Sequence, residues 1–183
     1  MFCLFRPLAP TWKYIIVGDY AVGKTSLCKV FSGESFKVEY KPTIGVDIFT
    51  RLAFIDNNFK VKFQIWDMAG QERFKHVMID YFRGAKAGAV VFDITRYETY
   101  ESVGEWVLMV RKNSGAIPLI LVGNKLDLEE KRMITAEEGK ELAKKLELIG
   151  YIEASAKNNI NVEKVFIEPI RHYYDQHKRY LRK

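Results

Sequence analysis

Short apolar runs alternate along this chain with longer segments in which apolar residues recur at helical spacing. The runs that predict strands are rich in β-branched and aromatic residues and cover residues 14–17, 46–55, 59–66, 88–92, 117–122 and 149–154. Helical patterns cover residues 26–31, 71–83, 100–112, 135–146 and the stretch after 161. Strands that alternate with helices, together with one early hairpin, predict an α/β fold with a mixed, mostly parallel six-stranded sheet and helices on both faces.

Local signals mark several boundaries of these elements. Asp56-Asn57-Asn58 is a hairpin signal between two predicted strands. Thr135 and Glu138 have the spacing of a capping box and open a helix. Asn161 is expected to cap the last helix, and Pro169 is expected to kink it about a third of the way along.

Length and composition are those of one soluble globular domain. The chain has 183 residues, of which 48% are hydrophobic and 28% charged. We expect a loose N-terminal arm at 1–12, a domain at 13–175 and a basic C-terminal end at 176–183.

No apolar run approaches the roughly 20 residues needed to span a bilayer, and the start of the chain lacks the basic region of a signal peptide. Two cysteines, Cys3 and Cys28, indicate no disulfide framework, so we expect a cytoplasmic location.

The charge balance permits two kinds of anionic partner. The net charge is +6 and the pI is near 9.2. Nucleic-acid binding would rest on this charge alone and is not predicted. Residues 171–183 carry five basic residues against one acidic residue, a net charge of +4. This stretch is either a solvated helix end or a site of weak attraction to an anionic membrane, at the cytoplasmic face.

The candidate chemistry begins at Gly18–Thr25, which spell G-D-Y-A-V-G-K-T and match the P-loop pattern G-x-x-x-x-G-K-[ST]. A predicted strand precedes this loop and a predicted helix follows it, so backbone N–H groups and a helix dipole point at one place, where an anion fits. Lys24 would reach the β- and γ-phosphates of a nucleotide, and the Thr25 hydroxyl would hold Mg²⁺. The alternative is a chance glycine turn beside a lysine. The nucleotide-contacting residues predicted here are Asp19, Tyr20, Ala21, Val22, Gly23, Lys24, Thr25 and Ser26.

A second motif, Asn124-Lys125-Leu126-Asp127, follows a predicted buried strand and distinguishes guanine from adenine. The Asp127 carboxylate can accept hydrogen bonds from both N1–H and the exocyclic amine of guanine, whereas adenine has no such donor pair. Ser155-Ala156-Lys157 follows the last strand and supplies a backbone N–H suited to the guanine O6. The alternative for each is a polar turn after a strand.

A third motif, Asp67 to Gln71, ends the second strand of the hairpin. Asp67 suits the magnesium-site role of a Walker-B aspartate. Gly70 lets its backbone N–H approach a γ-phosphate closely. Gln71 is the candidate for orienting the attacking water, and it forms the predicted catalytic set with Lys24.

In order and spacing, these motifs resemble the full set of the Ras superfamily of small GTPases, a group of P-loop proteins. Within that superfamily the chain is most similar to the Rab family. Besides Gly18–Thr25, Thr43, Asp67–Gln71, Asn124–Asp127 and Ser155–Lys157, the stretches that carry this resemblance are Ile44–Asp47, Lys62–Asp67, Glu72–Phe74, Tyr81–Gly84 and Phe92–Thr95.

The resemblance implies further roles and partners. Thr43 would ligate Mg²⁺ when GTP is bound, Phe36 would stack near the guanine, and Lys125 would pack along the base. Tyr40 would also contact the nucleotide. The loops around Thr43 and Gly70 would be nucleotide-sensing switches, ordered by the γ-phosphate and released on hydrolysis. Residues 36–83 would then bind effector proteins, an exchange factor and a GTPase-activating protein, with the chain acting as a monomer.

The chain departs from the Rab pattern at several positions. Tyr20 and Ala21 stand where Rabs usually have serine and then glycine, and Met68 replaces a threonine. Ile48 stands where the effector surface normally has a phenylalanine. No cysteine follows Cys28, so the prenylation signal of a Rab C-terminus is missing from this sequence.

These observations predict a switch that binds GTP or GDP with Mg²⁺, hydrolyses GTP to GDP and phosphate at a slow intrinsic rate, and acts in regulation of the membrane-trafficking type. The alternative is a GTP-binding interaction module with little or no turnover, because Tyr20 would leave the P-loop on the side of the γ-phosphate.

Overall fold

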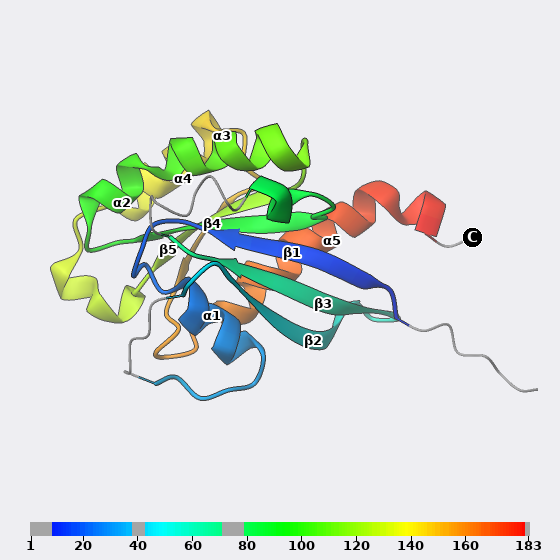
Figure 1. Ribbon diagram of the computed structural model, residues 1–183. Coiled ribbons are helices and arrows are strands. Elements are labelled where there is room, and N and C mark those ends of the chain that lie inside the picture. Colours follow the sequence, from blue (N-terminus) through cyan, green and yellow to red (C-terminus); the bar gives the residue numbers. More distant parts are fainter. Residues whose placement is uncertain (1–8, 38–42, 71–78, 182–183) are drawn as a thin grey trace, which may run out of the picture.

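In the computed structural model, residues 9–37, 43–70 and 79–181 are described. Within these ranges six strands form one sheet in the order β2-β3-β1-β4-β5-β6 (Figure 1). The strands are β1 (Thr11–Val17), β2 (Val46–Asp56), β3 (Phe59–Met68), β4 (Ala87–Asp93), β5 (Leu119–Asn124) and β6 (Tyr151–Ala154). The predicted mixed, mostly parallel sheet is therefore confirmed.

Strand pairing brings the candidate loops to one edge of this sheet. β1 pairs in parallel with β3 and with β4, and β5 pairs in parallel with β4 and β6. The β2–β3 pair is antiparallel and turns at Asn57 and Asn58, as the hairpin signal predicts. Because β1, β3, β5 and β6 run in the same direction, the segments that follow them meet at the carboxyl edge of the sheet.

Helices cover both faces of the sheet (Figure 1). They are α1 (Lys24–Phe31), α2 (Tyr97–Glu101), α3 (Val103–Ser114), α4 (Ala136–Lys145) and α5 (Val162–Leu181), and two short 3₁₀ segments lie at Ile79–Phe82 and Leu126–Lys131. One buried cluster joins α1 and α5 to the sheet, and a second joins α3 and α4 to the opposite face. Side chains alternate between faces along a strand, so in β1 Tyr14 and Ile16 belong to the first cluster while Ile15 and Val17 belong to the second.

The N-terminal boundary of the sheet lies earlier than the sequence predicts. Thr11 and Trp12 belong to β1 instead of to a loose arm, because Trp12 is a core residue with only 5% of its surface exposed. Its ring lies 5.8 Å from that of Phe59 and 5.2 Å from that of Tyr173. The predicted helix at 71–83 falls mostly outside the described residues, which begin again with the 3₁₀ segment at Ile79.

The predicted helix boundaries had mixed outcomes. The capping box at the start of α4 is confirmed, because Thr135 Oγ1 accepts from the backbone N–H of Glu138, and Glu138 Oε2 accepts from that of Thr135. The helix predicted at 100–112 is confirmed from Val103 on, but its first residues belong to the separate short helix α2, and α2 and α3 meet at Ser102. The Asn161 side chain donates to the carbonyl oxygen of Glu153 in β6 at 2.8 Å, which ties the start of α5 to the sheet.

Helix α5 continues through Pro169. A proline has no N–H, so the carbonyl group four residues earlier, that of Val165, loses its usual helical donor. The hydroxyl of Tyr14 in β1 donates to this carbonyl oxygen at 2.6 Å, and Tyr14 is fully buried. The tyrosine therefore supplies the hydrogen bond that the proline cannot, and it joins the first strand to the last helix. Among the described residues, no helix combines the length and the apolar character needed to cross a membrane.

Candidate nucleotide-binding site

A cavity of about 380 Å³ opens at the carboxyl edge of the sheet. It collects residues from the segments that follow β1, β3, β5 and β6, together with residues 35–37 and Thr43. The predicted site residues that line it are Tyr20, Ala21, Gly23, Lys24, Thr25, Ser26, Phe36, Thr43, Gly70, Asn124, Lys125, Asp127, Ala156 and Lys157. Four lining residues were not predicted, namely Lys29, Ser35, Lys37 and Leu128.

The P-loop has the backbone conformation of an anion site. Ala21 and Gly23 have positive φ angles of 62° and 97°, which turn the loop back on itself before α1 begins at Lys24. Position 23 also has no room for a side chain, since a Cβ there would lie 2.3 Å from Nδ2 of Asn124. Asn124 donates from this nitrogen to the carbonyl oxygen of Val22 at 2.8 Å. The base-reading segment is thus fixed directly to the phosphate-binding loop.

Lys24 lies across the loop. Its ammonium donates to the carbonyl oxygens of Gly18 and Asp19, both at 2.8 Å, and only 6% of the residue is exposed. Burial lowers its pKa to about 8, against the opposing attraction of Asp67 and Asp19. A phosphate group in this cavity would compensate the cost of burying the cation.

Two of the predicted contact residues, Asp19 and Val22, have side chains that face other parts of the protein. The Asp19 carboxylate faces α3, where it accepts from Ser102 Oγ at 2.7 Å and from Trp106 Nε1 at 2.8 Å. Val22 is fully buried in the core. These residues can therefore offer a nucleotide their backbone only. Tyr20, by contrast, does line the cavity and is 39% exposed.

The three predicted magnesium ligands lie together. Thr25 Oγ1 donates to Asp67 Oδ2 at 2.5 Å and lies 3.0 Å from Thr43 Oγ1. Asp67 is fully buried, and its Oδ1 atom has no hydrogen-bond partner in the described part of the chain. Burial raises the pKa of Asp67 to about 6, opposed by the nearby Lys24. A hard divalent cation prefers such oxygen ligands, so the residues present fit Mg²⁺.

The base end of the cavity is built around Asp127. Its Oδ1 atom accepts from Ser155 Oγ at 2.6 Å, and Lys157 Nζ lies 4.0 Å from Oδ2. Ser155 is fully buried beneath the carboxylate and orients it instead of lining the cavity. Lys125 has a positive φ of 70°, and its ammonium pairs with Asp93 Oδ2 at 2.7 Å. The loop that follows the last strand therefore orients the Asp127 carboxylate, which is predicted to read the base.

The comparisons with known proteins agree with this geometry. A family model described as the Ras family matches residues 13–175. The chain belongs to the Ras family. Ras-related protein RABA5b of Arabidopsis thaliana is 43% identical over 171 residues, which cover 93% of this chain and 78% of that relative. Ras-related protein Rab-12 of Homo sapiens is 40% identical over 164 residues, which cover 89% of this chain and 67% of that relative. This member of the Ras family is thus a Rab-like small GTPase, a class whose usual ligands are GTP or GDP with Mg²⁺.

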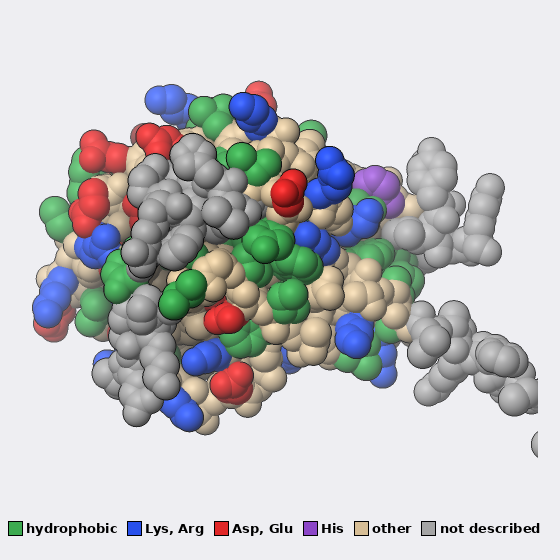
Figure 2. Space-filling view, viewed as in Figure 1, with side chains coloured by type: hydrophobic (Ala, Val, Ile, Leu, Met, Phe, Trp, Pro, Cys, Tyr) green, Lys and Arg blue, Asp and Glu red, His purple; other side chains and the backbone are tan. Residues whose placement is uncertain are grey.

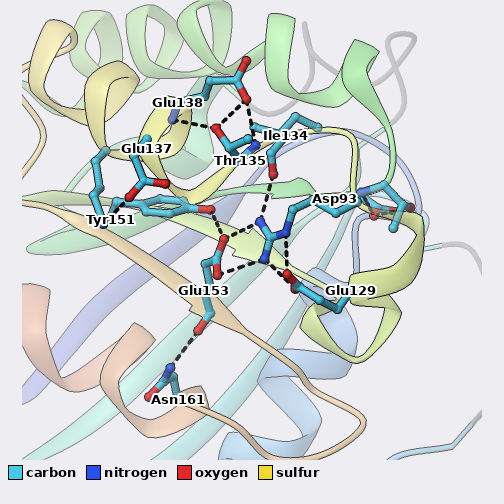
Figure 3. Close-up of polar contacts among 12 residues, drawn as sticks. Asp93, Glu129, Ile134, Thr135, Glu137, Glu138, Tyr151, Glu153 and Asn161 are labelled. Carbon is cyan, nitrogen blue, oxygen red and sulfur yellow. Dashed lines mark hydrogen bonds and ion pairs between the residues drawn. The ribbon is translucent and has the colours of Figure 1, made fainter.

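In this Ras-family chain an ionic network joins the two segments that are predicted to hold the base. Figure 3 shows Glu129 and Glu153 converging on one guanidinium, that of Arg132. Arg132 donates to Glu153 Oε1 at 2.6 Å and to Glu129 Oε1 and Oε2 at 2.9 and 2.6 Å. Tyr151 adds a hydrogen bond to Glu153 at 2.9 Å. Because these residues flank the motifs at 124–127 and 155–157, the network fixes the distance between those motifs.

Two predicted site residues, Gln71 and Tyr40, lie outside the described residues, so their roles stay predictions. Other residues that contact the site were not predicted from the sequence. Ser102, Trp106 and Arg96 were not predicted as site residues, although they contact the P-loop. A signal for one of them existed, since a buried tryptophan requires an acceptor for its indole N–H.

Proposed function

We propose that this Rab-like GTPase is a switch that hydrolyses GTP to GDP and phosphate slowly and binds effectors according to its nucleotide. The observation that carries this proposal is the joining of a guanine reader to a phosphate loop in one cavity, through Asn124 and Val22. The Rab names of its relatives support a role in the regulation of membrane traffic.

The reaction would be an in-line attack of water on the γ-phosphorus, which forms one P–O bond as the bond to the β–γ bridging oxygen breaks. Lys24 would hold the phosphate oxygens as charge shifts toward the leaving GDP. Gln71 would orient the attacking water. Thr25, Thr43 and Asp67 would hold Mg²⁺, which when bound neutralises charge on the β- and γ-phosphates.

The slow rate rests on Tyr20. Tyr20 lines the cavity at the P-loop, and its backbone nitrogen lies close to Gly70. We expect its side chain on the side where water and γ-phosphate would meet. A phenol there would obstruct the positioning of water, and a misplacement of about 1 Å can cost roughly a hundredfold in rate. It would also occupy the space that an arginine finger of an activating protein needs.

Single-turnover hydrolysis of bound GTP tests this role. Tyr20→Gly should hydrolyse GTP at least about tenfold faster than the wild type, with GDP affinity unchanged within about twofold. Tyr20→Phe is the matched control, since it keeps the bulk and removes the hydroxyl, and it should stay slow. A Tyr20→Gly rate no higher than the wild-type rate would show that Tyr20 is not the brake.

The same feature supports a second candidate function, a GTP-dependent interaction module that barely turns over. The two functions differ in one measurement, because the module would retain GTP through many hours of single-turnover incubation and the switch would convert it to GDP.

Effectors would bind an apolar patch formed by Ile48, Trp66 and Tyr81. Ile48 lies opposite Trp66 in the β2–β3 ladder, and the rings of Trp66 and Tyr81 are 5.7 Å apart. Ile48 is 51% exposed. Figure 2 shows hydrophobic side chains gathered near the middle of the face in view. Together with the rest of residues 36–83, this patch would also meet an exchange factor and an activating protein.

A further inference from the structure

The segment that contains α2 and the start of α3 contacts two consecutive residues of the P-loop. Ser102 and Trp106 both donate to the carboxylate of Asp19, at 2.7 and 2.8 Å. Arg96 donates to the carbonyl oxygen of Tyr20 at 3.0 Å. One short stretch of chain therefore holds residues 19 and 20 by three separate hydrogen bonds, two to the Asp19 side chain and one to the Tyr20 carbonyl oxygen.

The peptide between Asp19 and Tyr20 is covered by Gly70. A Cβ at position 70 would lie 2.3 Å from the carbonyl carbon of Asp19 and 2.5 Å from both the carbonyl oxygen of Asp19 and the N atom of Tyr20. Gly70 thus rests directly on the peptide, and any displacement of either is transmitted to the other. In the proposed function Gly70 is the residue whose N–H approaches the γ-phosphate.

The contacts from α3 are suited to fix this peptide in place. Trp106 has 1% of its surface exposed and is packed in the core beneath α3, so its indole cannot follow the loop without a shift of the helix. Ser102 precedes α3, but its hydroxyl makes no capping hydrogen bond to that helix. The same hydroxyl oxygen lies 3.1 Å from the carbonyl oxygen of Thr99 in α2, so Ser102 joins the end of α2 to Asp19. The Asp19 carbonyl is in turn held by Lys24.

We propose that Arg96, Ser102 and Trp106 are positioning residues for Asp19 and Tyr20 of the P-loop, and that through them the start of α3 responds to the presence of the γ-phosphate. This inference rests on the proposed function, because it requires a γ-phosphate at Gly70. It predicts that the surroundings of the first turns of α3 differ between the GDP-bound and GTP-bound states. A purely structural anchor would hold the P-loop in the same way in both states.

The fluorescence of Trp106 tests directly whether α3 responds to the γ-phosphate. The chain has three tryptophans, so a protein with Trp12→Phe and Trp66→Phe emits from Trp106 alone. Its emission should differ between the complex with GDP and the complex with a non-hydrolysable GTP analogue, both with Mg²⁺. Asp19→Ala in this protein should abolish the difference, because it removes the hydrogen bond from the indole to the loop.

Single-turnover kinetics in the otherwise native chain test the positioning. Ser102→Ala should slow GTP hydrolysis about fivefold to tenfold while GDP affinity stays within about twofold, because the loop moves relative to the reacting phosphate. Ser114→Ala is the matched control, since Ser114 lies at the other end of α3 and donates to the carbonyl oxygen of Phe82 at 3.0 Å. Glu98→Gln is a control for the role of Arg96. It removes the ion pair between Arg96 and Glu98 and leaves the hydrogen bond from Arg96 to Tyr20.

Emission that is the same in both nucleotide states would overturn the inference, as would equal hydrolysis rates for Ser102→Ala and Ser114→Ala in a wild type that turns over. A wild type that binds guanine nucleotide without hydrolysing it would contradict the proposed switch, and Trp106 emission alone would then decide the inference. A wild type that binds no guanine nucleotide would overturn both.

Discussion

Removal of the Tyr14 hydroxyl tests whether a tyrosine replaces the helical hydrogen bond that Pro169 cannot make. Tyr14 is fully buried, and burial raises the pKa of its phenol well above the ordinary value, so the group remains a donor to the Val165 carbonyl. Tyr14→Phe keeps the ring and its packing against Phe166, whose centroid lies 5.2 Å away. The change therefore isolates one hydrogen bond.

The loss of unfolding free energy depends on which donors remain for the Val165 carbonyl oxygen. When Pro169 is present, Tyr14→Phe removes the hydroxyl that donates to this carbonyl oxygen, and a buried unsatisfied acceptor costs about 1–3 kcal/mol. In a Pro169→Ala background the alanine N–H lies four residues beyond Val165 and can donate instead. The same Tyr14→Phe change should then cost about 1 kcal/mol or less, so the coupling between the two positions should be about 1–2 kcal/mol.

Urea unfolding of the four proteins of this cycle measures that coupling. GDP and Mg²⁺ must be held at one concentration throughout, because ligand binding to the native state raises the apparent free energy of unfolding. Tyr100→Phe is the control. Its hydroxyl also donates to a helix carbonyl, that of Glu138 at 3.2 Å, but the residue four positions on is Leu142, which has an ordinary N–H. Equal losses for Tyr14→Phe with and without Pro169 would refute the replacement.

Two further predictions concern the nucleotide. Asp127→Asn should weaken GTP binding by roughly 10- to 150-fold, the effect of losing hydrogen bonds to a charged acceptor, and should improve binding of xanthine nucleotide, whose C2 oxygen needs a donor. Competition with a fluorescent nucleotide measures both, and an unchanged GTP affinity would remove Asp127 from base recognition. Thr25→Asn should weaken GTP binding more than GDP binding, by roughly tenfold, because Thr25 contacts Thr43 in the triphosphate-linked site. Equal losses for both nucleotides, measured by the same competition, would contradict that arrangement.

The sequence predicted the parts of the site that depend on backbone position. Gly23, Lys24 and Asp127 lie where their motifs place them, because a motif of fixed spacing on a strand and a loop determines where the backbone runs. The sheet followed for the same reason, since runs of buried β-branched residues can pair in few ways.

Side-chain direction was not predictable in the same manner. Asp19 belongs to the P-loop motif, yet its carboxylate turns to Ser102 and Trp106, residues far along the chain whose approach depends on how α3 packs. Trp12 was assigned to an arm because two nearby prolines hide the strand pattern, and only its packing against Phe59 and Tyr173 shows its role. Tertiary contacts of this kind leave no periodic signal in a single sequence.

The order of the strands has a consequence for how the molecule folds. In the described sheet the β2–β3 hairpin pairs neighbouring segments across a two-residue turn, whereas each parallel pairing, such as Thr11 with Lys62, must first close a loop of dozens of residues. The hairpin can therefore form early, while the cavity exists only after β1, β3, β5 and β6 have aligned their ends. Guanine nucleotide then cannot template the early steps. It instead holds the finished fold together, so its binding should slow unfolding far more than it speeds folding.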